Sequence, residues 1–162
     1  MALLLSASDT REVILAKADS WGVARWLVDA IIHSEGGYNP DGRGWTVGGD
    51  AGQSWGAWQL YYGGGLGNAF TRDTGLNAWD RDTWEAQADW CLALIVARGA
   101  QAGDNWDWLA SQWHGLPKHR PGGAVDDVGG GDPVPIIEGG ALATWLLVVG
   151  LGVLIVAIGS RR

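Results

Sequence analysis

HSEGGYNPDGRGWTVGGDAGQSWGAWQL, residues 33–60, is the stretch on which the fold and the function of this chain depend. Glu35 ends an apolar helical pattern, and eight glycines then fall within residues 36–56. Glycine reaches backbone conformations that other residues avoid and lets two segments approach closely. Since a long loop in a compact domain usually has a function, residues 36–56 predict a functional loop or a small β-ribbon beside Glu35.

Helical patterns flank this loop on both sides. Before it, helices are expected over residues 10–18 and 21–35, capped by the pair Asp9 and Glu12 and by Asp19 or Ser20, respectively. After it, residues 57–70 are expected to begin with another helix, followed by turns over 71–80 and further helices over 82–98 and 105–113. The predicted fold class of this part is mainly α.

The C-terminal residues differ in composition from the rest. Residues 139–160 carry no charge over 22 positions, and a helix of that length, rising about 1.5 Å per residue, spans the roughly 30 Å of a bilayer's hydrocarbon core. We therefore expect a globular domain over residues 1–115, a Pro- and Gly-rich linker over 116–138 and a single transmembrane helix over 139–160. A buried central helix is the alternative, disfavoured because the remaining chain is too short to cover it.

Residues 1–115 are acidic and rich in tryptophan. They hold 14 Asp and Glu against 7 Lys and Arg. Nucleic acid is therefore not an expected partner, because phosphate binding needs a basic face. Eleven of the 12 tryptophans lie here, more than so small a domain can bury. Several are expected to line a groove of the kind that stacks sugar rings.

No metal site, cofactor or disulfide is expected. Cys91 is the only cysteine, and the three histidines do not cluster with carboxylates at the spacings of metal ligands. The N-terminal MALLL is too short for a signal peptide.

Glu35 has the setting of a general acid. The negative end of the helix dipole and the apolar neighbours Ile31 and Ile32 are both expected to raise the pKa of its carboxyl group. A carboxylic acid that stays protonated near neutral pH can protonate a glycosidic oxygen. A surface Glu in the last helical turn is the alternative that position alone would favour.

Several short motifs follow one another in an order known from one enzyme family. They are Glu35-Gly36-Gly37 continued by Tyr38, then Gly56-Ala57-Trp58-Gln59-Leu60, the stretch 86–93 and Asn105-Trp106. Over roughly residues 20–115 this order resembles the lysozyme-like lytic transglycosylases, which cut peptidoglycan glycan strands and include phage virion enzymes with a C-terminal membrane helix. The chain departs from the family at Gln112-Trp113-His114-Gly115, where an Ala-Tyr-Asn is usual, so His114 is a candidate replacement for the Asn.

The resemblance implies a lysozyme-like α+β domain that cleaves the MurNAc-GlcNAc β-1,4 bond. Glu35 would be the catalytic acid and later the base, and the candidate substrate-binding residues are Tyr38, Gly56, Trp58, Gln59, Tyr62 and His114. A backbone-bonded role is the alternative for Gln59, and core packing is the alternative for the aromatic residues. The one-acid mechanism of the family gives a 1,6-anhydro sugar. Hydrolysis is the competing outcome, for which Asp50 could supply a second carboxylate.

The expected partners are a peptidoglycan glycan strand, a lipid bilayer through residues 139–160, and other virion proteins. Since the domain has no recognisable export signal, we expect a single-pass membrane protein held in a virion and delivered to the host cell wall. Two other functions stay open. One is a catalytically inactive structural or glycan-binding protein of a virion, and the other is a holin-like membrane disruptor.

Overall fold

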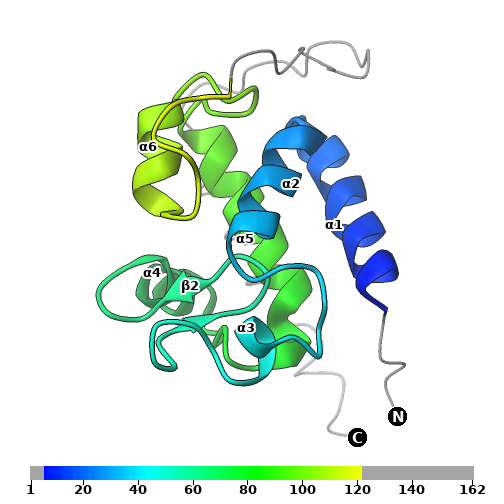
Figure 1. Ribbon diagram of the computed structural model, residues 1–162, viewed down its shortest axis with the longest axis vertical. Coiled ribbons are helices and arrows are strands. Elements are labelled where there is room, and N and C mark those ends of the chain that lie inside the picture. Colours follow the sequence, from blue (N-terminus) through cyan, green and yellow to red (C-terminus); the bar gives the residue numbers. More distant parts are fainter. Residues whose placement is uncertain (1–5, 122–162) are drawn as a thin grey trace, which may run out of the picture. The chain divides into compact units, whose positions relative to one another are not determined.

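The computed structural model describes residues 6–121 of the chain (Figure 1). The transmembrane helix predicted over residues 139–160 lies outside these residues, as does most of the predicted linker. Within residues 6–121, no helix is long and apolar enough to cross a bilayer. The described part is mainly helical, as predicted.

Seven helical segments and one short hairpin make up this part. In chain order they are α1 (Ala7–Trp21), α2 (Arg25–Ser34), α3 (Arg43–Thr46), β1 (Ser54–Trp55), β2 (Leu60–Tyr61), α4 (Leu66–Thr74), the 3-10 helix η1 (Arg81–Thr83), α5 (Trp84–Ala97) and α6 (Trp106–Gln112). The two strands pair antiparallel, with Ser54 opposite Tyr61 and Trp55 opposite Leu60. The helices predicted over 82–98 and 105–113 are confirmed as α5 and α6.

The first helix begins earlier than predicted. Ser6 is its N-cap: the Ser6 hydroxyl accepts a hydrogen bond from the Asp9 N–H, and the Asp9 carboxylate accepts one from the Ser6 N–H, both at 3.1 Å. The predicted cap, Asp9, is therefore the third helical residue, in a capping box. The helix ends at Gly22, whose φ of 65° is the left-handed conformation that favours glycine.

The second helix supplies the wall from which Glu35 projects. It begins after Ala24 with no side-chain cap, so the predicted caps Asp19 and Ser20 were wrong because both still belong to α1. Its buried residues Leu27, Val28, Ile31 and Ile32 are fully buried. This apolar face fixes α2 in the core and brings its C-terminal end to the site.

The middle of the chain departs most from the prediction. No helix begins near residue 57, because Gly56 (φ 78°) and Gln59 (φ 46°) turn the chain from β1 into β2. The turns expected over residues 71–80 start only after α4, which ends at the left-handed Gly75. The loop over residues 36–56 contains the single turn α3 and the first strand of the hairpin, β1, whose partner β2 lies beyond the loop.

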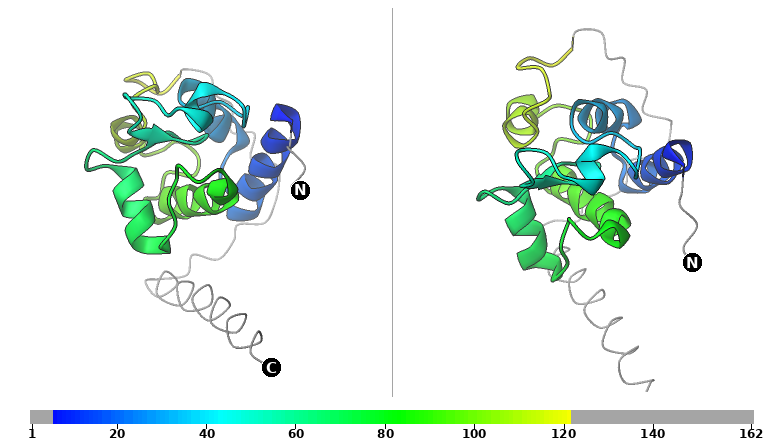
Figure 2. Two further views of the ribbon diagram at one scale, coloured as in Figure 1. Left: turned by 90° about the horizontal axis from the view of Figure 1, so that it is seen from below. Right: turned by 60° about the horizontal axis from the view of Figure 1, so that its bottom comes forward.

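The core is built around α5. In both Figure 1 and Figure 2, α5 lies between α1 and α4. Its buried residues include Ala88, Cys91, Leu92 and Ile95, all with no exposed surface. The same core contains the rings of Trp58 and Trp113, so the hairpin and α6 are held against the helices by large aromatic side chains.

Candidate functional site

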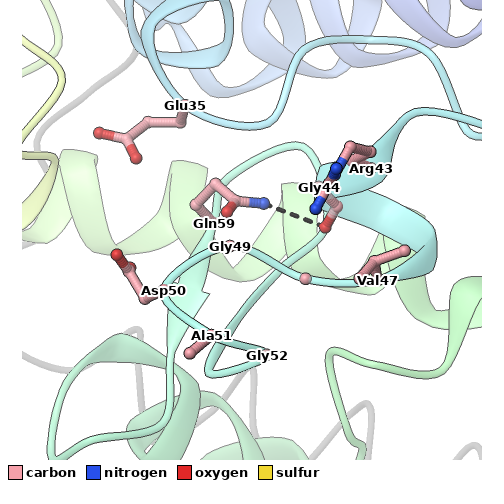
Figure 3. A pocket seen from close by; sticks show the side chains of 10 residues that line it. Glu35, Arg43, Gly44, Val47, Gly49, Asp50, Ala51, Gly52 and Gln59 are labelled. Carbon is pink, nitrogen blue, oxygen red and sulfur yellow. Dashed lines mark hydrogen bonds between the residues drawn. The ribbon is translucent and has the colours of Figure 1, made fainter.

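One cleft of about 520 Å³ lies between the end of α2 and the glycine-rich segment (Figure 3). Its lining residues are Glu35, Arg43, Gly44, Val47, Gly48, Gly49, Asp50, Ala51, Gly52 and Gln59. Glu35 comes from the end of α2, and every other lining residue comes from residues 43–59. The structure therefore brings together Glu35 and Gln59, the two polar residues that the motifs singled out.

Glu35 is half-buried and fixed at the end of α2. Its side-chain Oε1 accepts a hydrogen bond of 2.8 Å from the Gly115 N–H, which follows α6. Burial is the largest influence on its pKa and raises it, the negative charge of Asp50 also raises it, and the Gly115 N–H and nearby His114 oppose these effects. The net shift is upward, which confirms the predicted direction.

The glycines allow three pieces of main chain to meet beneath Glu35. The Gly36 N–H donates to the Ala57 carbonyl at 3.2 Å, and the Gly56 N–H donates to the Gly44 carbonyl at 3.0 Å. A Cβ atom added at Gly36 would lie 2.0 Å from the Gly56 carbonyl oxygen, closer than real Cβ contacts. The end of α2, the start of α3 and the hairpin turn therefore pack backbone against backbone, which larger residues would prevent.

Gln59 ties these pieces together. Its backbone is left-handed, and its Nε2 donates to the carbonyls of Gly44 at 3.0 Å and Gly56 at 2.9 Å. Both amide hydrogens are thus bonded to main chain, as in the backbone-bonded alternative. Only the Oε1 atom is left to bind a ligand in the cleft.

Asp50 lies across the cleft from Glu35, in a strained turn. Asp50 and Ala51 both have positive φ, 47° and 56°, and the turn is closed by a 2.7 Å bond from the Gly49 N–H to the Ser54 carbonyl. The buried Ser54 hydroxyl donates to the Asp50 carboxylate. In Figure 3 that carboxylate points to the side of the cleft where Glu35 lies. Strained, non-glycine backbone of this kind clusters at functional sites.

Two of the aromatic residues expected to contact sugars, Trp58 and Tyr38, are instead in the core, together with Trp113. Trp58 has no exposed surface, Trp113 is 1% exposed, and the Trp113 Nε1–H donates to the Trp58 carbonyl at 3.2 Å. Tyr38 is 7% exposed, and its hydroxyl donates to the Asp29 carboxylate at 2.7 Å. A buried ring cannot stack on a sugar, so the predictions of substrate contact for Trp58 and Tyr38 were wrong.

The remaining predicted residues, Tyr62, Gly56 and His114, are not among the residues that line the cleft. The Tyr62 hydroxyl accepts from the Ala78 N–H at 2.8 Å and is 3.0 Å from the Thr71 hydroxyl, so its polar end is already bonded. Gly56 contributes main-chain bonds beneath Glu35, and His114 is exposed next to the Gly115 N–H that binds Glu35. Gly56 and His114 therefore lie beside Glu35 and Gln59 without being part of the wall of the cleft.

The motifs missed two charged residues of the cleft, Arg43 and Asp50. Both residues lie in the glycine-rich loop that follows Glu35, and this position could have indicated that they line the cleft. However, no motif includes either residue. Within residues 6–121, no group of three or more His, Cys, Asp or Glu side chains is placed to hold a metal ion. Comparison of the chain with protein-family models, with curated proteins and with solved structures gave no match.

Proposed function

We propose that this chain cleaves the β-1,4 bond between MurNAc and GlcNAc in peptidoglycan, as a lytic transglycosylase or a lysozyme-type hydrolase. One observation carries the proposal: a half-buried carboxyl group with a raised pKa lines a cleft of about 520 Å³. The order of the motifs around Glu35 supports it. No cofactor is part of the proposed chemistry.

Glu35 would act first as the acid. Its carboxyl group, whose pKa is raised by burial, would donate its proton to the glycosidic oxygen as the bond to the anomeric carbon breaks. The resulting carboxylate keeps the 2.8 Å hydrogen bond from the Gly115 N–H, which stabilises the negative charge that this step creates. The carboxylate then removes a proton from the nucleophile, and the acid is restored.

The nucleophile decides between the two products. Attack by the 6-hydroxyl of the same sugar gives a 1,6-anhydro product and needs Glu35 alone. Attack by water gives a reducing end, and a second carboxylate usually assists it. Asp50 would be the carboxylate in that role, and two observations support this: it lines the same cleft, and its charge raises the pKa of Glu35. The cleft therefore supports hydrolysis as a real competitor to the anhydro product.

Cell-wall digestion followed by mass spectrometry of the released muropeptides tests the proposal. The native chain is expected to release fragments, whose masses distinguish anhydro from reducing ends. Glu35→Gln is expected to release none, and the matched control Glu12→Gln, which changes an exposed carboxylate on α1, is expected to behave as the native chain. If native chain and Glu35→Gln both fail to cut but bind cell walls, the chain is an inactive glycan-binding protein.

The membrane and virion assignments belong to the same proposal. The uncharged run over residues 139–160 motivates membrane attachment, and the resemblance motivates a place in a virion. Flotation of the full-length chain with lipid vesicles, compared with a chain ending at residue 138, tests the first, and recovery of the chain in purified virus particles tests the second. Leakage of vesicles caused by residues 139–160 alone would favour the holin-like alternative.

A further inference from the structure

Arg43 differs from the other arginines that the structure describes. Residues 6–121 contain seven arginines, and six of them contact a carboxylate or an aromatic ring: Arg11, Arg25, Arg72, Arg81, Arg98 and Arg120. Arg43 has neither kind of contact within the described part of the chain, although the chain has 18 acidic residues. Its side chain is exposed and lines the cleft. The guanidinium group is therefore available to a ligand.

The backbone that carries Arg43 is fixed to the floor of the cleft. The Arg43 carbonyl accepts hydrogen bonds of 2.9 Å from the N–H groups of Val47 and Gly48. The next residue, Gly44, accepts from the Gly56 N–H and from the Gln59 side chain. The flexible side chain thus starts from a rigid point, and Figure 3 shows Arg43 and Asp50 on opposite sides of Gln59.

The charges of the cleft indicate which kind of ligand Arg43 would bind. Glu35, Asp50 and Arg43 are its only charged lining residues, and the chain carries a net charge of −7. An anionic substrate would be repelled by Asp50 and by the chain as a whole. The planar guanidinium group of Arg43 offers two parallel N–H donors, the geometry that matches a carboxylate.

Resting on the proposed function, we infer that Arg43 binds a carboxylate of the substrate and so selects carboxylate-bearing glycan strands over neutral ones. In peptidoglycan that carboxylate comes from one of two sources, the lactyl group of the muramic sugar or the attached peptide. A neutral β-1,4 strand of N-acetylglucosamine has neither. Arg43 is then a residue of substrate choice, separate from the proton transfer at Glu35.

The test compares three substrates with the full-length chain. They are a chitin hexasaccharide, which is neutral, glycan strands freed of peptide, which expose the lactyl carboxylate, and strands that keep their peptides. The measured quantity is kcat/KM on each strand divided by kcat/KM on the hexasaccharide. Arg43→Gln is expected to lower this ratio about tenfold or more, as expected for loss of a charge-assisted hydrogen bond. Arg43→Lys is expected to fall between Arg43→Gln and the native chain, and Arg72→Gln, which changes an exposed arginine outside the cleft, to leave the ratio unchanged.

Each outcome decides the inference. A fall confined to peptide-free strands assigns the lactyl carboxylate, and a fall confined to peptide-bearing strands assigns the peptide. An unchanged ratio in an Arg43→Gln chain that cuts all three substrates overturns the inference and leaves the proposed function intact. If the native chain cuts nothing, the proposed function fails. In that case, the affinity of the native and Arg43→Gln chains for the same strands is measured by calorimetry. Equal affinities of the two chains would overturn carboxylate binding by Arg43 as well. If Arg43→Gln does not fold, Arg43→Lys decides by the same criteria.

Discussion

The substitution Gly36→Ala probes the main-chain packing beneath Glu35. The new Cβ atom would lie 2.0 Å from the Gly56 carbonyl oxygen and 3.0 Å from the Gln59 Nε2, whereas ordinary contacts begin at 3.4 Å. The backbone at Gly56 would therefore have to move by about 1.4 Å, the difference between 3.4 Å and 2.0 Å, an overpacking that typically costs about 1–3 kcal/mol. The same movement strains the 2.9 Å bond that the Gly56 carbonyl accepts from the Gln59 side chain, worth about 1 kcal/mol more.

The expected loss is thus about 2–4 kcal/mol, which lowers the Tm of a domain this size by roughly 10 °C or more. Thermal unfolding of the full-length chain, followed by near-UV circular dichroism of its 12 tryptophans, measures it. The matched control is Gly37→Ala. A Cβ atom there meets nothing within 4 Å, so only the left-handed φ of 69° is penalised, at about 1–2 kcal/mol. Equal melting of the two variants, or a Gly36→Ala chain as stable as the native one, would refute the packing argument.

Three further outcomes are expected from the same structure. The folded-state pKa of Glu35 lies above its unfolded value, so the native chain loses stability as pH rises through the interval between the two values. Glu35→Gln should therefore have a higher Tm than the native chain at pH 7. In thermal scans, this difference in Tm should shrink as the pH is lowered towards 4. Asp50→Asn removes a charge that raises the Glu35 pKa, so the basic limb of the pH–activity profile should move to lower pH, and an unmoved limb would contradict the coupling. Ser6→Ala removes the α1 cap and should cost about 1 kcal/mol in urea unfolding, whereas Ser20→Ala should cost less because Ser20 lies in the last turn of α1.

Periodic segments could be predicted from the sequence, and the short hairpin could not. The helix α5 has a long apolar pattern with a clear end at Arg98 and Gly99, and its predicted bounds are close to those observed. The strands β1 and β2 have two residues each, which is too short for any alternation to be recognised. Their turn depends on a left-handed Gln59, a conformation that glutamine itself does not suggest.

The candidate site was predictable only where a motif marked it. Glu35 and Gln59 were found because motifs place them in order along the chain. Asp50 and Arg43 reach the cleft through the course of the glycine-rich loop, which depends on main-chain bonds between distant segments. Trp58 was assigned wrongly because it adjoins Gln59 in the motif, and adjacency in sequence does not show whether a ring is buried or faces water.

The hydrogen bond between Glu35 and Gly115 also has a mechanical consequence. Gly115 lies between two anchors: Trp113 is bonded through its ring to the Trp58 carbonyl, and after the buried Leu116 the Pro117 carbonyl accepts from the Trp106 ring. A pulling force applied to the chain beyond residue 121 would be resisted at Pro117 and Leu116 before it displaced Gly115. Tension on the downstream chain would therefore load the contacts of Pro117 and Leu116 before it reached the hydrogen bond that Gly115 donates to Glu35.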